Sequence, residues 1–317
     1  MSEEASESTA SENDASSEGA DTLEGTLATT EAEDAPNTTD AEGTLESLVD
    51  APTDEQDPFN YPYASPGHSF VSDGDEVLNI QFGKEGDLSS AYIMKDGKQV
   101  SIQNLIEGKQ ALVVYGSLGN PQQIAKSLGK KEVAAVQARV KGLEPGYNLI
   151  SKNGNAIAEV LPSEGATMEA YVLFVDQSDI SKLNSRESHY DLVSIDDVTL
   201  ETGESIDSKI YMGNTPLWNI DGQPVGMQEI ATSGRKYAAK THQEALTAMI
   251  RQYGLADQGI STPRQFIDAV KTDKSITSKI EAEKNKTGLA SAVEQYKAMP
   301  NPDYMPKPQA SVASPTI

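Results

Sequence analysis

The chain has 317 residues with 49 acidic and 25 basic side chains, a net charge of −24, and no cysteine. The lack of cysteine excludes disulfides, thiolate metal sites and a cysteine nucleophile, and it fits a reducing compartment. Residues 1–83 hold 21 of the acids and none of the bases, so the remaining chain, with 28 acids and 25 bases, is nearly neutral. Nucleic-acid binding needs clustered positive charge, so we expect none. No run of about 18 apolar residues occurs and no signal peptide is expected, so we predict a cytoplasmic protein without a membrane span.

Residues 1–56 consist mainly of Ser, Thr, Ala, Glu, Asp and Gly. Such a composition cannot bury enough apolar surface to offset the entropy of ordering, so we expect a disordered acidic tail. The tail is interpreted either as a solubilising arm or as a docking arm. Residues 57–110 are expected to form an extended strap, "DPFNYPYASPGHSF", and then a β-hairpin extension. Alternating residues on both sides of Asp96-Gly97 indicate that hairpin, since both turn residues tolerate a positive φ.

Residues 111–214 are predicted to form the central domain. It begins with a buried strand, "ALVVY", and Asn120-Pro121 then starts a helix that ends at Gly129. Short strands are expected over 132–140, 147–150, 155–161 and 167–176. A helix over 178–187 with Ser178 as N-cap follows, and then strands within 190–200 and 208–214.

Residues 215–300 are expected to be mainly helical. Thr241 and Glu244 form a predicted capping box for a helix over 241–254, and Thr262-Pro263 begins a second. A third helix is expected within 275–299, and the Pro-rich residues 301–317 are predicted to be a flexible tail. Strands early in the chain and helices late predict the α+β class.

The loop Gly116-Ser117-Leu118-Gly119 joins the buried strand to the first helix. Its spacing fails both the Walker pattern and the dinucleotide fingerprint, which excludes these phosphate loops. The loop can instead offer backbone N–H groups to a carboxylate or an oxyanion. The alternative is that Gly116 and Gly119 only permit a tight turn. The three histidines lack ligand spacing, so we predict no metal and no cofactor.

Further segments follow this loop in a characteristic order: "GNAIAEVLPSEGATMEAYVLFVD" and then "SDISKLNSRESHYDLVSI". With "VVYGSLGNPQQIAKSLG" they resemble the γ-glutamylcyclotransferase-like superfamily, the AIG2-like fold, over about residues 111–213. The family combines a Tyr-Gly-Ser-Leu loop with a later Leu-Asp-x-x-Glu-x-x-Tyr element. Here that element runs from Leu183 to Tyr190, with Asn184 in place of the Asp.

The resemblance implies a small, mixed, β-barrel-like α+β fold in which the loop and Glu187 face one cavity. It further implies an enzyme that releases 5-oxoproline from a γ-glutamyl-amine or γ-glutamyl peptide without a cofactor. Carried over by motif, Glu187 is the catalytic base and acid. The implied substrate-binding residues are Tyr115, Gly116, Ser117, Leu118 and Tyr211.

Two alternatives stay open. Glu187 could simply form a helix-terminal salt bridge with Arg186 or Lys182. The whole chain could then be a non-catalytic structural or interaction protein, whose acidic tail or C-terminal helices contact a protein partner. An open cavity that joins Glu187 to the loop favours the enzyme. A filled cavity, or a Glu187 held by a base, favours the alternative.

Overall fold

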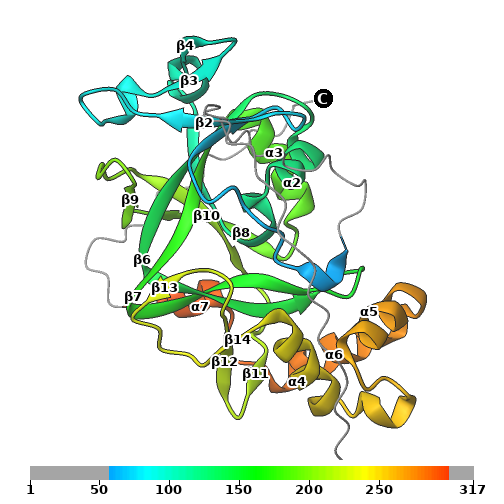
Figure 1. Ribbon diagram of the computed structural model, residues 1–317. Coiled ribbons are helices and arrows are strands. Elements are labelled where there is room, and N and C mark those ends of the chain that lie inside the picture. The colour runs from blue at the N-terminus through cyan, green and yellow to red at the C-terminus, as the bar shows by residue number, and fades with distance from the viewer. Residues whose placement is uncertain (1–56, 300–317) are drawn as a thin grey trace, which may run out of the picture. The chain divides into compact units, whose positions relative to one another are not determined.

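The computed structural model describes residues 57–299, so the predicted tails over 1–56 and 301–317 lie outside the described residues. The α+β class is confirmed, because one large mixed sheet carries several helices (Figure 1). The sheet follows the order β4-β3-β2-β1-β6-β7-β5-β10-β8, and its two end strands do not pair. The sheet is therefore open. None of the helices in the described part combines the length and apolar character that crossing a bilayer requires.

The strands of this path have these bounds: β1 (Phe70–Ser72), β2 (Val77–Gln81), β3 (Tyr92–Lys95), β4 (Lys98–Ser101), β5 (Gln110–Val114), β6 (Val133–Ile150), β7 (Ala156–Val175), β8 (Tyr190–Ile195) and β10 (Ser208–Gly213). Short strands pair beside them: β9 (Val198–Leu200), β11 (Asn219–Ile220), β12 (Gln223–Met227), β13 (Thr232–Ser233) and β14 (Ala239–Lys240). The α-helices are α1 (Gln103–Ile106), α2 (Pro121–Leu128), α3 (Gln177–Arg186), α4 (His242–Gln252), α5 (Pro263–Thr272), α6 (Lys274–Thr287) and α7 (Ala292–Lys297). Single 3₁₀ turns are η1 (Pro58–Asn60), η2 (Leu88–Ser90), η3 (Gly116–Gly119) and η4 (Leu255–Gln258).

A long antiparallel hairpin, β6–β7, forms the centre of the sheet. The expectation of four short strands was wrong, because β6 and β7 each join two of them. Pro145 pairs opposite Val160, and Pro162 pairs opposite Leu143, so neither proline ends its strand. The irregularity falls instead at Gly142, which has a φ of 77° where the register shifts. Between the pairs Lys141–Thr167 and Leu143–Pro162, β6 has one residue and β7 has four, so the extra residues lie on β7. A second, smaller register shift falls between Tyr147 and Ile150.

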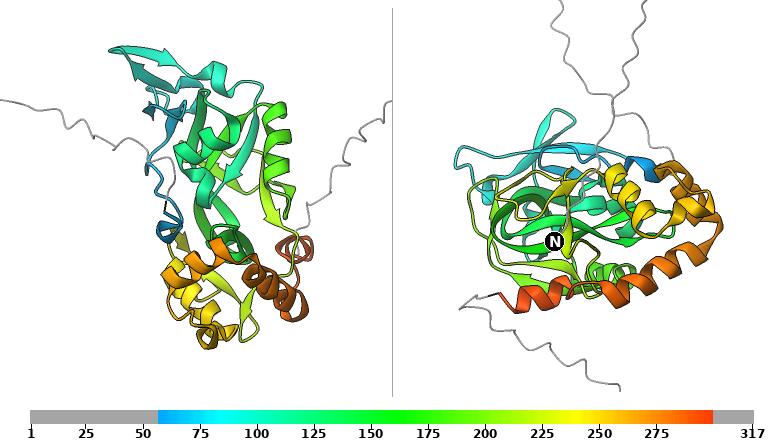
Figure 2. Two further views of the ribbon diagram at one scale, coloured as in Figure 1. Left: turned by 90° about the vertical axis from the view of Figure 1, so that its right-hand side faces the viewer. Right: turned by 90° about the horizontal axis from the view of Figure 1, so that it is seen from below.

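The N-terminal hairpin agrees with the sequence prediction. Strands β3 and β4 pair on either side of Asp96 and Gly97, whose φ values of 50° and 70° fit the expected turn. The hairpin projects at one end of the described part, and α4, α5 and α6 gather at the other (Figure 2). The predicted strap contains η1 and ends at β1, which pairs with β6.

Strand β5 is buried on both faces, which explains its continuous apolar sequence. Leu112 and Val114 belong to the apolar core that includes side chains of α2 and α3. Ala111 and Val113 belong to the core on the other face. Strand β5 lies between β7 and β10, antiparallel to β7 and parallel to β10. This position brings the end of β5 close to residues that follow it by about 100 positions.

The C-terminal helices differ from prediction at one point. The capping box of Thr241 and Glu244 at the start of α4 is confirmed, and Thr262 caps α5 as expected. The predicted third helix is two helices, α6 and α7. Leu289 lies between them and exchanges two backbone hydrogen bonds of 3.0 Å with Leu217. Those bonds need extended backbone, so the helix is interrupted there.

Candidate functional site

The predicted loop is a single 3₁₀ turn, η3, that directly follows β5. Gly116 has a φ of 61°, in the left-handed region, whereas Gly119 has no positive φ. The sequence argument that both glycines serve the turn therefore holds for Gly116 alone. Asn120 caps α2 as predicted, because its Oδ1 accepts the backbone N–H groups of Gln122 (3.0 Å) and Gln123 (3.2 Å).

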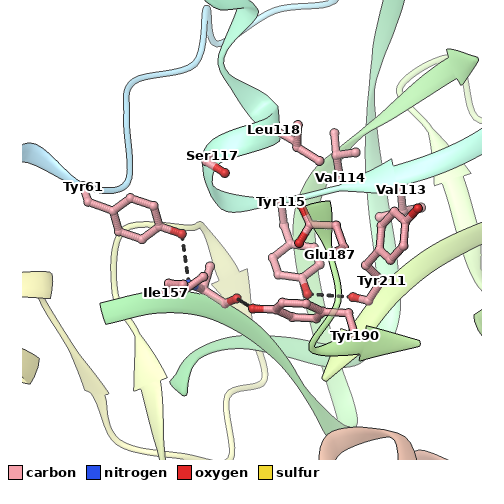
Figure 3. Close-up of a pocket in the computed structure, with 11 residues that line it drawn as sticks. Tyr61, Val113, Val114, Tyr115, Ser117, Leu118, Ile157, Glu187, Tyr190 and Tyr211 are labelled. Atoms are coloured by element: carbon pink, nitrogen blue, oxygen red, sulfur yellow. Dashed lines mark hydrogen bonds between the residues drawn. The ribbon is translucent and has the colours of Figure 1, made fainter. Parts of the chain in front are cut away.

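The predicted site residues meet at one small cavity (Figure 3). Its lining residues are Tyr61, Val113, Val114, Tyr115, Ser117, Leu118, Ile157, Ala158, Glu187, Tyr190 and Tyr211. The cavity has a volume of about 40 Å³, room for a few water molecules. Gly116 borders it, since a Cβ built on Gly116 would lie 2.8 Å from the Cβ of Ala158. The fold thus brings Glu187 to a loop about 70 residues away in sequence.

Glu187 is positioned by the end of α3. Its backbone N–H donates to the carbonyl of Leu183 across 2.8 Å, which closes the last helical turn. The helix begins two residues earlier than predicted, with Asp176 rather than Ser178 as N-cap, because the Asp176 N–H donates to the Asp179 carboxylate. The Glu187 side chain is 17% exposed. Burial raises its pKa above the ordinary value, and the Arg186 guanidinium opposes this rise.

The Arg186 guanidinium contacts Glu187, the loop and helix α2. Its Nε lies 3.2 Å from Oε1 of Glu187, and its Nη2 donates to the Ser117 hydroxyl across 3.0 Å. Its Nη1 also donates to the Ser127 hydroxyl on α2. Lys182, the other base considered for Glu187, pairs with Asp179 instead. One of the two proposed ion pairs is therefore present, and it also holds the loop.

Three tyrosines of the cavity use their hydroxyl protons within the protein. Tyr115 donates to the backbone carbonyl of Tyr211 across 2.7 Å, and Tyr190 donates to the carbonyl of Ala158 across 2.9 Å. Tyr211 donates to Oδ1 of Asn184, also across 2.7 Å. Asn184 is the position at which the sequence departs from the family motif. Its amide keeps an acceptor there without adding a second negative charge beside Glu187.

A second carboxylate lies close to the cavity, and the sequence analysis missed it. Glu159 on β7 is fully buried, and its Oε1 accepts the N–H groups of Gly213 and Val160, both at 2.9 Å. The buried Asn148 amide and Lys284 complete its surroundings. Burial raises the pKa of Glu159 to about 7. Its only signal in the sequence is one acid within the apolar run "AIAEVL".

Tyr61 and Tyr190 are the polar lining residues that sequence reasoning did not assign to the site. Tyr190 could have been found, since it ends the Leu183–Tyr190 element. Tyr61 lies in an irregular strap, where no periodicity predicts the direction of a side chain. Within residues 57–299, no group of three His, Asp or Glu could hold a metal ion. His242, at the start of α4, accepts the Ala156 N–H through Nε2, and burial lowers its pKa to about 4.

Comparison with known proteins finds similarity at the level of structure. No protein-family model matches the chain, and no curated protein sequence matches it. The similar solved structures include two whose names give a γ-glutamyl cyclotransferase.

Three of these structures have sequence identities to this chain between 15% and 20%. One is a γ-glutamyl cyclotransferase that is 15% identical, with a TM-score of 0.31. The match covers 51% of this chain and 86% of the cyclotransferase chain. A yeast γ-glutamyl cyclotransferase specific to glutathione is 16% identical, with a TM-score of 0.27. The match covers 51% of this chain and 94% of the yeast chain. An Arabidopsis thaliana protein solved in solution is 20% identical, with a TM-score of 0.30 and coverage of 47% and 87%. Each of the three matches covers about half of this chain.

Proposed function

We propose that this protein is a γ-glutamyl cyclotransferase-type enzyme that releases 5-oxoproline from a γ-glutamyl-amine or γ-glutamyl peptide. One observation carries the proposal: Glu187 lines the same cavity as Ser117 and Leu118 of the loop. The two motif elements are far apart in sequence, and an unrelated fold would have no reason to bring them together. The substrate is then a small γ-glutamyl compound, and the amine or peptide that leaves is not assigned.

The proposed reaction is an intramolecular acyl transfer. The α-amine nitrogen of the γ-glutamyl group bonds to its own γ-carbonyl carbon, and the bond from that carbon to the leaving nitrogen breaks. Because nucleophile and electrophile belong to one molecule, ring closure mainly requires a folded pose. The walls of the cavity, Tyr115, Leu118 and Tyr211 among them, are proposed to hold that pose.

Glu187 is proposed to move protons. The α-ammonium nitrogen loses two protons on becoming the lactam N–H, and the leaving nitrogen gains two and departs as an ammonium group. Glu187 is proposed to carry these protons one at a time, so that no net proton is released or taken up. A carboxylate performs both steps best when its pKa lies closer to neutrality than usual. The burial that raises the pKa of Glu187 supports this role. The Nε of Arg186 lies 3.2 Å from Oε1 of this carboxylate, and its positive charge opposes part of that rise.

Two observations favour a second candidate, a non-catalytic protein that reuses the fold. Glu187 already has a basic partner in Arg186. The cavity is also small, with a volume of about 40 Å³. In this candidate the acidic tail or the C-terminal helices contact a protein partner, and the cavity has no ligand.

The experiment is an assay of 5-oxoproline release by the full chain from a panel of γ-glutamyl-amines, dipeptides and isopeptides, quantified by mass spectrometry. We expect release from at least one class, and Glu187→Gln to lower its rate by at least about a hundredfold. Glu107→Gln is the matched control, because Glu107 is exposed and lies just before β5, outside the cavity. Circular dichroism checks that all three proteins are folded. Folded wild-type protein that yields no 5-oxoproline across the panel supports the second candidate instead.

A further inference from the structure

Tyr61 enters the cavity from a segment that precedes the family-like part of the chain. It lies in the strap after η1, about 50 residues before β5, and only 6% of its surface is exposed. Its hydroxyl accepts the backbone N–H of Ala158 on β7 across 2.9 Å. In Figure 3 the ring stands at the side of the cavity and its hydroxyl points inward toward β7. The strap therefore provides one wall of the site.

The Tyr61 hydroxyl differs from the other tyrosine hydroxyls at the cavity. Tyr115, Tyr190 and Tyr211 each donate their proton to a protein acceptor. Tyr61 accepts a hydrogen bond, and within the described residues its own proton has no protein acceptor. A phenol oxygen that accepts from one side directs its O–H toward another. Among the tyrosines that line this cavity, Tyr61 is thus the one whose hydroxyl proton remains available to a ligand.

This donor faces the loop. A Cβ built on Gly116 would lie only 3.0 Å from the Tyr61 oxygen, so the hydroxyl lies against the first residue of η3. Burial raises the pKa of Tyr61 above its ordinary value, and nearby Glu187 adds to the rise. The phenol therefore keeps its proton at neutral pH, where it can serve as a donor.

The strap that carries Tyr61 is fixed at several points. Asp57 accepts two hydrogen bonds of 2.8 Å from Arg264 of α5, whose guanidinium also stacks 4.4 Å from the Phe59 ring. Beyond Tyr61, the Asn120 amide donates to the Ala64 carbonyl across 2.6 Å. The Tyr61 ring packs at 5.4 Å from His242. A donor held in this way loses little conformational entropy when it binds.

We propose that Tyr61 is a substrate-binding residue whose hydroxyl donates a hydrogen bond to an oxygen of the γ-glutamyl group. The inference rests on the proposed cyclotransferase function and assigns to it a residue that lies outside the family-like segment. The ligand chemistry is that of a carboxylate or an amide oxygen, both of which a neutral phenol recognises. The strap is then part of the active site rather than only a cover for it.

The test compares Tyr61→Phe with Tyr63→Phe in the full chain. Tyr63 lies two residues away on the same strap and does not line the cavity. Tyr61→Phe is expected to lower kcat/KM for 5-oxoproline release by about tenfold to a hundredfold, the effect of one hydrogen bond to a charged or polarised oxygen. Calorimetry with 5-oxoproline is expected to give a matching loss of affinity, and Tyr63→Phe leaves both values unchanged. Equal losses in the two variants, or no loss in Tyr61→Phe, overturn the inference while the proposed function stands.

A second measurement covers the case in which Tyr61→Phe folds poorly because the Ala158 N–H loses its acceptor. Incorporation of 3,5-difluorotyrosine at position 61 keeps the ring and the oxygen but makes the phenol more acidic. Loss of activity on the alkaline side should then begin at a lower pH than in wild type, because the ionised phenol cannot donate. An unchanged pH profile overturns the inference. Wild-type protein that neither binds 5-oxoproline nor releases it overturns the proposed function and this inference together.

Discussion

Arg186 and Glu187 are neighbours at the end of α3, and the Nε of Arg186 lies 3.2 Å from Oε1 of Glu187. The same guanidinium donates to Ser117 of the loop across 3.0 Å. Glu187 is therefore subject to two opposing influences. Burial raises its pKa and Arg186 lowers it. The balance between them sets the pH at which the Glu187 carboxyl ionises, and with it the pH range in which the proposed base is charged.

Removal of the Arg186 charge is expected to move the pH dependence of activity. In Arg186→Met the attraction for the ionised carboxylate is lost while burial remains, so the pKa of Glu187 rises further. The acid limb of kcat/KM, which reports the ionisation of the base, should shift to higher pH and activity on that limb should fall. Lys182→Met is the control, since Lys182 pairs with Asp179 one turn earlier. A shift of the same size in both variants would contradict a specific Arg186–Glu187 interaction.

The two glycines of η3 are expected to respond differently to alanine. At Gly116 the new Cβ would meet Ala158 at 2.8 Å and Tyr61 at 3.0 Å, on a backbone with positive φ. We expect Gly116→Ala to lower the free energy of unfolding by about 1–3 kcal/mol. At Gly119 the nearest atom would be 3.6 Å away, an ordinary contact, so Gly119→Ala should change stability by less than about 1 kcal/mol. Urea denaturation of both variants checks this, and similar losses at the two positions would refute the distinction.

Glu159 is expected to make stability fall as pH rises. Its folded-state pKa of about 7 exceeds its ordinary value of 4.5, so the folded protein binds more protons than the unfolded chain between these values. The free energy of unfolding therefore decreases through this window, by about 3 kcal/mol from this group, and levels off above it. Glu159→Gln keeps an acceptor for Gly213 and Val160 and should remove the decrease.

Urea denaturation at several pH values between 4.5 and 8 measures this effect as the difference between wild type and variant. The stabilisation of Glu159→Gln relative to wild type should grow with pH and become constant above pH 7. The exposed Glu107→Gln serves as the reference for a carboxylate removed from the surface. Parallel curves for wild type and Glu159→Gln would show that the buried carboxylate does not titrate in this range.

Local patterns account for the parts of the protein that could be predicted. The apolar run of β5, the Asn120-Pro121 start of α2 and the Asp96-Gly97 turn each depend on neighbouring residues, and all three are present. Glu187 was found because a family motif contains it, and the fold places it at the cavity with the loop. Its predicted role stays a prediction.

Long-range packing decided what could not be predicted. Strands β6 and β7 continue through Pro145 and Pro162 because each has a partner along its length, whereas a single sequence indicates breaks. Glu159 has no spacing that distinguishes it from a surface acid, and only the burial of β7 makes it unusual. Tyr61 comes from a strap without periodicity, so its place in the cavity follows from contacts with Ala158 and His242.

Asn120 uses both ends of its amide, the oxygen for the first turn of α2 and the nitrogen for the strap carbonyl of Ala64. One side chain thus serves the loop side and the strap side of the same cavity. A shortened protein that began at residue 111 would keep the loop, α3 and Glu187, but its cavity would lack a wall and Asn120 would lose one partner. The region that resembles the family is therefore not a complete site in this chain, because the N-terminal extension supplies part of its enclosure.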